Sequence, residues 1–234
     1  MHSRLILLLR FMLKKTPHLL LAIWVFSAHA GSYEDFFRAI ERDEAAPIEA
    51  LIARGFDANS LSPKGQSGLF MAMNLGHFSA ARALLSDPQL RVDEVNAVGE
   101  TALMMAALKG HLEWCQRLVH LGAAVRRTGW TPLHYAASAG LPSQVAVIEF
   151  LMLSGAQVDA ESPNGTTPLM LAAMYGSEAS VRALLAHGAS TKRRNLRDLN
   201  AVDFARLAGR DKLAEALQRF EPPVPMPPAN APAK

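Results

Sequence analysis

The chain has 234 residues, with 24 Lys and Arg against 21 Asp and Glu, a formal net charge of +3 and a single cysteine. Residues 1–30 hold four basic residues and no acidic one, so residues 31–234 carry a net charge of −1. This balance argues against general electrostatic binding to nucleic acid or to an anionic membrane, and one cysteine excludes an intramolecular disulfide and a cysteine metal cluster.

Residues 1–30 have the pattern of a cleavable export signal. Two lysines precede an unbroken apolar run over residues 19–26, and small residues stand just before Gly31, as at a signal-peptidase site. These eight apolar residues are too few to span a bilayer, which takes about 20, and Gly31 lacks the thiol that a lipoprotein would acylate. We therefore expect export without a stable membrane anchor, with translation starting at Met1 or Met12; an amphipathic helix or an uncleaved anchor is the alternative.

After residue 30 the sequence repeats one phrase at nearly fixed spacing. The phrase reads Gly-Trp-Thr-Pro-Leu-His-Tyr-Ala-Ala at 129–137 and Gly-Thr-Thr-Pro-Leu-Met-Leu-Ala-Ala at 165–173, with looser copies at 99–107 and 65–73. Counted at the Thr position, the copies lie 34, 30, 36 and 33 residues apart, at Ser67, Thr101, Thr131, Thr167 and Asn200.

A period near 33 residues with Thr-Pro-Leu-His resembles the ankyrin repeat. The resemblance implies an all-α solenoid of about six helix-turn-helix repeats with projecting finger loops. It also implies a protein that mediates protein–protein contacts and has no catalytic activity of its own.

We expect this repeat domain to cover residues 31–220. The first and last copies are degenerate, because a terminal repeat must show one face to water. Residues 221–234 contain six prolines, so we expect a disordered tail of polyproline character; partner docking by this tail is the alternative. The repeats are expected at about 33–65, 66–98, 99–128, 129–164, 165–197 and 198–220.

Several residues have predicted structural roles within the repeat. Thr131 and Thr167 can cap the first helices, each followed by a proline at the first helical position. Cys115 is expected to be an inert core thiol rather than a redox centre, and the resemblance implies that His134 tethers neighbouring loops by hydrogen bonds. The helix-ending glycines are expected in the left-handed conformation: Gly76, Gly110, Gly140 and Gly176.

Two departures from regular spacing occur in the middle of the array. The loop over residues 124–130 is three residues short, and the turn near Leu141 is enlarged by a similar amount. The two changes cancel over the pair of repeats. We expect a notch in the row of finger loops, which is either a specificity device or neutral drift in a loop.

Motifs that carry catalytic chemistry are missing downstream of residue 30. The sequence there has no Gly-x-Ser-x-Gly, phosphate-binding loop, dinucleotide fingerprint, His-Glu-x-x-His or Cys-x-x-Cys. We therefore expect no catalytic centre, no metal ion and no cofactor. An enzyme with an unrecognised site is the alternative.

The first helices of the repeats are expected to form a partner-binding groove. Methionines and aromatics dominate the positions that should face it, and exposed apolar stripes commonly mark interaction sites. In the alternative interpretation these side chains are buried against one another. Under the binding interpretation, serine at Met105 and Tyr135 would abolish partner capture with little effect on stability. The candidate partner-binding residues are Met71, Leu75, Met105, Leu108, Tyr135, Leu171, Tyr175 and Phe204.

A second candidate surface is a basic patch on two finger loops. It could dock an acidic partner or a phosphate group, although a solvated loop is the default expectation. Its members are Arg126, Arg127, Lys192, Arg193, Arg194 and Arg197.

An export signal joined to ankyrin repeats resembles periplasmic members of that family in Gram-negative bacteria. We therefore expect a monomeric periplasmic adaptor that binds a segment of another exported protein. A secreted effector that binds a host protein is the alternative. The identity of the partner lies beyond the sequence.

Overall fold

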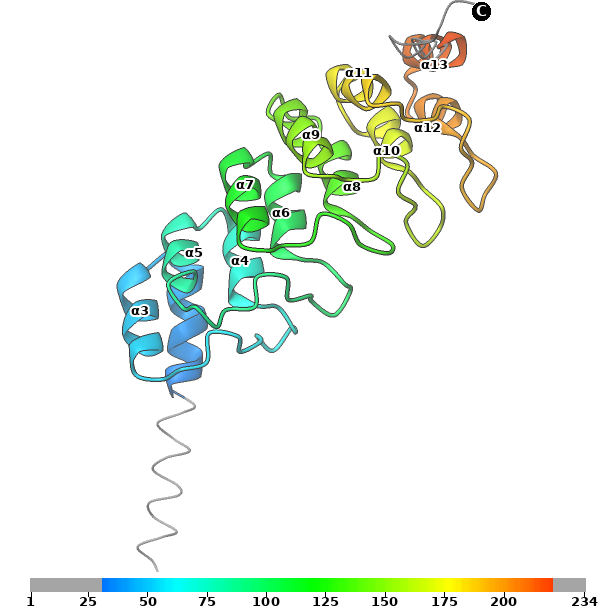
Figure 1. The fold of residues 1–234 in the computed structure, drawn as a ribbon. Helices are drawn as coiled ribbons and strands as arrows, with labels where there is room; N and C mark the ends of the chain where they lie inside the picture. The colour runs from blue at the N-terminus through cyan, green and yellow to red at the C-terminus, as the bar shows by residue number, and fades with distance from the viewer. Residues whose placement is uncertain (1–30, 221–234) are drawn as a thin grey trace, which may run out of the picture. The chain divides into compact units, whose positions relative to one another are not determined.

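The computed structural model describes residues 31–220, which fold into consecutive pairs of antiparallel helices joined by loops (Figure 1). The predicted export signal and the proline-rich tail lie outside the described residues. Within residues 31–220 the only β-type pairing is an antiparallel bridge between Leu61 and Ser67. The predicted all-α fold of paired helices is confirmed. The chain divides into two compact units at residue 90, and each is described by itself.

The first unit holds two helix pairs. Residues 31–41 are helical and form the first pair with α3, while α4 and α5 form the second. Phe36 and Ile40 of the first helix are fully buried, together with Ile48 of α3 and Leu84 of α5. Its bounds are α3 Ala45–Ala53, α4 Gly68–Leu75 and α5 Phe78–Leu84.

The second unit holds four helix pairs whose first helices α6, α8, α10 and α12 pack in sequence. The second helices α7, α9 and α11 also pack in sequence, and α13 packs against α12. In this unit the loops between the pairs project to the same side (Figure 1). The bounds are α6 Ala102–Leu108, α7 Leu112–His120, α8 Pro132–Ala137, α9 Gln144–Leu153, α10 Pro168–Met174, α11 Glu178–Ala186, α12 Ala201–Leu207 and α13 Asp211–Arg219.

In four repeats the first helix begins at a polar side chain that caps it: Ser67, Thr101, Thr167 and Asn200. The predicted cap at Thr131 is wrong, because its hydroxyl lies 2.8 Å from Nδ1 of His134 and makes no cap hydrogen bond to the helix backbone. Thr167 Oγ1 accepts from the backbone N–H of Met170 at 3.4 Å, as predicted, and Pro168 occupies the first helical position. Asn200 accepts from the N–H groups of Val202 and Asp203 in the last repeat. These caps satisfy N–H groups that have no partner within the helix.

The helix-ending glycines divide into two kinds. Gly76 and Gly110 have φ of +76° and +72°, the left-handed conformation that was expected. For Gly140 and Gly176 that prediction is wrong, because neither has a positive φ. A Cβ at Gly176 would lie 2.6 Å from the carbonyl oxygen of Ala137, so close approach of the two chain segments, rather than backbone conformation, requires glycine there.

Hydrogen bonds join neighbouring finger loops in the second unit. The carboxylate of Asp93 accepts from the backbone N–H of Ala124 at 3.1 Å, and Asp159 accepts from that of Ser190 at 3.0 Å. The next junction along the chain after Asp93 joins the shortened loop to the loop that follows α9. There Nε of Arg126 donates to the carbonyl oxygen of Gly155. At this junction the earlier loop donates, which is the reverse of the links made by Asp93 and Asp159.

Candidate partner-binding surface

The structure divides the predicted groove residues by exposure. Leu75 and Tyr175 are exposed, at 49% and 60%, while Leu108, Tyr135 and Leu171 are half-buried. Met71 and Leu75 belong to the first unit, and the other six belong to the second.

The expected partial exposure is wrong for Met71, Met105 and Phe204. Their exposed fractions are only 9%, 4% and 9%. In the second unit the reason is that the first helices pack directly on one another, α6 on α8 and α10 on α12, and small alanines on those helices allow a close approach. Met105 and Phe204 are therefore part of the core.

A hollow of about 240 Å³ lies among the half-buried members of the row in the second unit. Trp130 precedes α8, Tyr135 lies on α8, Ser138 ends that helix, and Leu171 lies on α10. We call this the Trp130 hollow, and His134 completes its lining. It combines two large aromatic side chains with the aliphatic Leu171 and with Ser138, whose hydroxyl donates to the carbonyl oxygen of Tyr135.

The imidazole of His134 fixes one wall of the hollow. Its Nδ1 lies 3.2 Å from the backbone N of Thr131, which can only donate, so Nδ1 is the acceptor and Nε2 carries the proton. Nε2 donates to the carbonyl oxygen of Thr166 at 3.0 Å, as the predicted tether between loops requires. The Trp130 ring meets the imidazole edge-on at a centroid distance of 5.3 Å.

Burial keeps His134 neutral. The side chain is fully buried, and desolvation lowers the pKa of His134 to about 4, although hydrogen bonds to the carbonyls of Thr166 and Ala160 oppose the change. Protonation of Nδ1 would also abolish its hydrogen bond from Thr131. This histidine is therefore a structural tether that stays uncharged near neutral pH.

Tyr135 is held in place from the other side. Its hydroxyl donates to Oε1 of Glu100 at 2.7 Å, and Asn96 Nδ2 donates to Oε2 of the same carboxylate at 2.8 Å. Burial, followed by the neighbouring Glu100, raises the pKa of Tyr135 well above its ordinary value. The phenol is thus a fixed neutral wall, and the hollow exists before any partner arrives.

The sequence interpretation did not include Trp130 in the groove, although a signal for it exists. The residue between the glycine and the Thr position of the repeated phrase is Gln66, Glu100 and Thr166 in three of the other copies. Only the copy at 129–137 has a large aromatic side chain there. The degenerate last copy has Leu199 there. An aromatic residue at a position that is polar in three of the other four copies indicates a surface function rather than a place in the core.

Three of the six members of the predicted basic patch form ion pairs with acidic neighbours. Arg127 forms an ion pair with Asp93, and Arg126 donates to the backbone as described above. Arg193 lies 3.3 Å from Glu161, and Arg194 lies 3.4 Å from Asp198. Lys192 and Arg197 are exposed. The pairing of Arg127, Arg193 and Arg194 therefore lowers the free positive charge of the finger loops in part.

Cys115 lies on α7 and is fully buried. Desolvation raises the pKa of its thiol to about 12, so the thiolate is disfavoured and the prediction of an inert core thiol is supported.

Among residues 31–220 no three His, Cys, Asp or Glu side chains gather closely enough to hold a metal ion. None of the helices in this same part of the chain is both long and apolar enough to cross a membrane.

Comparison with known proteins finds one family over the whole described region. The family model "Ankyrin repeats (3 copies)" matches residues 36–128, 88–162, 115–195 and 142–221. SH3 and multiple ankyrin repeat domains protein 2 of Homo sapiens is 27% identical over 82% of this chain, and protein glp-1 of Caenorhabditis elegans is 29% identical over 72%. Protein phosphatase 1 regulatory subunit 27 of Mus musculus is 36% identical over 40% of the chain. The matched segments span only 10%, 14% and 57% of those three proteins respectively.

Proposed function

The chain belongs to the ankyrin-repeat family, and we propose that it is a non-catalytic adaptor that holds a segment of a partner protein in the Trp130 hollow. Ankyrin repeats generally mediate protein–protein interaction. The observation that carries the proposal is the hollow itself, in which Trp130, Tyr135 and Leu171 surround about 240 Å³ of space. The proposed site keeps Tyr135 and Leu171 from the predicted groove, adds Trp130, and leaves Met105 in the core.

The chemistry of the hollow favours one large apolar side chain from the partner. Trp and Tyr are enriched among the residues that dominate binding energy, particularly where a side chain enters a well-packed pocket. The aromatic walls are already fixed by the hydrogen bonds of His134 and Tyr135. Binding therefore orders few additional side chains, which lowers its entropic cost.

The exposed ring of Tyr175 extends this surface beyond the hollow. It follows α10 directly and is 60% exposed. Leu171, one turn earlier on the same helix, lines the hollow itself. A partner segment longer than one residue would contact Tyr175 after its anchor side chain is seated.

We further propose that the protein works in the periplasm as a monomer. The support is the export signal predicted in residues 1–30 and the near-neutral composition of residues 31–234. The relatives named above are eukaryotic proteins, and the chain spans about a tenth to just over half of their length, so their own activities are not assigned to it. Cell fractionation, N-terminal sequencing and size-exclusion chromatography test this proposal, with Gly31 as the expected first residue of a periplasmic monomer.

Partner capture from a periplasmic extract tests the binding proposal. Leu171→Glu places a charge in the hollow, and the matched control Leu153→Glu places it on α9 at a side chain that is 83% exposed. We expect a protein, identified by mass spectrometry, to be retained by wild type and by the control and lost with Leu171→Glu. Circular dichroism of each variant confirms that it is folded. Equal retention by both variants would show that the hollow is not the binding site.

A further inference from the structure

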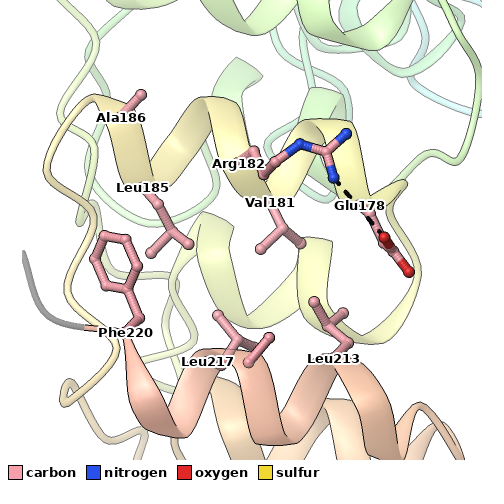
Figure 2. Close-up of a pocket in the computed structure, with 9 residues that line it drawn as sticks. Glu178, Val181, Arg182, Leu185, Ala186, Leu213, Leu217 and Phe220 are labelled. Atoms are coloured by element: carbon pink, nitrogen blue, oxygen red, sulfur yellow. Dashed lines mark ion pairs between the residues drawn. The ribbon is translucent and has the colours of Figure 1, made fainter.

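A second hollow lies on the other side of the last two repeats, between α11 and α13. Its volume is about 450 Å³. The side chains of Val181 and Leu185 on α11 point toward those of Leu213 and Leu217 on α13 (Figure 2). We call this space the α11/α13 groove; its lining is completed by Glu178, Arg182, Ala186, Ala216 and Phe220.

The walls of the groove are almost entirely apolar. Val181, Leu185, Leu213 and Leu217 are each less than 10% exposed and form its floor. The small exposed side chains Ala186 and Ala216 leave its rim open.

The polar groups at the groove offer an occupant few hydrogen bonds. Its two charged side chains, Glu178 and Arg182, pair with each other at 3.8 Å. The backbone N–H and carbonyl groups of both helices are largely consumed within the helices. An occupant must therefore be apolar and must bring few N–H groups that would lose their hydrogen bonds to water.

The described chain ends at this groove. Phe220 follows α13 directly, and its ring lies at one end of the groove near Leu185 (Figure 2). The backbone of Phe220 has φ −66° and ψ 118°, an extended conformation close to polyproline II. The chain thus turns out of α13 beside this apolar surface.

The sequence that follows Phe220 has the composition that this surface requires. Residues 222–228 read Pro-Pro-Val-Pro-Met-Pro-Pro, and five of these seven residues have no backbone N–H. Val224 and Met226 supply apolar side chains, and a methionine adapts readily to an irregular space. Five residues in the polyproline II conformation span about 16 Å. The axes of two packed helices are only about 8–10 Å apart, so a segment of this length reaches from α13 to α11.

We propose that residues 222–228 of the same chain dock in the α11/α13 groove as an extended proline-rich segment. This inference is independent of the Trp130 hollow. Because the segment is tethered within a few residues of the groove, its effective concentration there is in the millimolar range or above, which favours it over a free partner. Proline also restricts the unbound segment, so less conformational entropy is lost on docking. The segment would cover the apolar surface that α11 and α13 leave open.

A spin label on the tail tests the proposal in the protein as isolated. Cys115 is buried and unreactive, so a label attached to Met226→Cys reacts at that site alone. We expect the methyl signals of Val181, Leu185, Leu213 and Leu217 to lose intensity when the label is paramagnetic and to recover when it is reduced. Methyls of α7 are the internal reference. A label at Val224→Cys repeats the measurement in case the first label prevents docking.

A rim variant and a mixed sample decide between the possible occupants. Ala216→Arg closes the groove at an exposed position and should abolish the intensity loss, whereas Ala50→Arg, on an exposed position of α3, should not. Intensity loss that persists in Ala216→Arg would come from the tether alone and would overturn the proposal. Intensity loss that appears only between labelled and isotopically enriched copies would assign the groove to a second copy and overturn the proposal. Unchanged methyl signals with both labels would overturn it as well.

Discussion

Acidification should weaken the fold through His134. The imidazole is fully buried with Nδ1 accepting from the Thr131 N–H and Nε2 donating to the Thr166 carbonyl. The folded protein therefore holds the ring neutral, with a pKa of about 4, while the unfolded chain takes up a proton near the ordinary value of 6.5. The contribution of this group to stability is fully present above pH 6.5 and is lost as the pH falls toward 4.

The size of the effect follows from the two pKa values. Each pH unit between them changes the free energy of unfolding by about 1.36 kcal/mol. Between pH 7.5 and pH 5.0 the unfolded chain becomes protonated and the folded one does not, so the loss reaches about 2 kcal/mol. Below pH 4, where both states are protonated, it levels at about 3 kcal/mol.

Urea unfolding of wild type and His134→Gln at several pH values isolates the contribution of His134 to the pH dependence of stability. The glutamine variant cannot titrate at this position, and every other ionisable group is common to both proteins. Wild type is expected to be the more stable at pH 7.5, and its advantage should shrink by about 2 kcal/mol at pH 5.0. A difference that stays constant across this range, or that grows with acid, would refute the assignment of a neutral buried imidazole.

Three further predictions concern the core. Met105→Ser should lower the free energy of unfolding by about 2–5 kcal/mol in urea titrations. The control Leu153→Ser, at an 83% exposed side chain, should change it by no more than about 0.5 kcal/mol. Equal effects of the two substitutions would contradict the burial of Met105. Gly176→Ala brings a Cβ against the Ala137 carbonyl and should destabilise by about 1–3 kcal/mol, so an unchanged urea midpoint would contradict that close approach. Cys115 should resist alkylation in the folded protein at pH 8 and react after denaturation, whereas rapid native labelling would show an accessible thiol.

Much of the fold could be predicted because its determinants are local. Helix caps such as Thr167 and turn glycines such as Gly76 act on the residues beside them, and a fixed period repeats them along the chain. Gly176 marks the limit of this reasoning. Its requirement for glycine comes from Ala137, a residue of the neighbouring repeat, and no local pattern shows how closely two helices approach.

The candidate site was predicted only in part, because exposure depends on how tightly the repeats stack. Periodicity places Met105 and Tyr135 on the same face of successive repeats, yet one is core and the other lines a hollow. The composition of the finger loops likewise suggests free positive charge, but the acidic partner of Arg193 lies 32 residues earlier, at Glu161. Trp130, by contrast, could have been found from the sequence, because three of the other four copies have a polar residue at its position.

The inverted link at Arg126 has a consequence for how the array assembles. Repeats that resemble one another can pair out of order during folding, and similar modules then exchange neighbours or copies. At the junctions made by Asp93 and Asp159 the earlier loop accepts a hydrogen bond, whereas at Arg126 it donates one. A repeat stacked on the wrong neighbour would oppose donor to donor or acceptor to acceptor, so this arginine contributes an order to the second unit that its similar phrases do not.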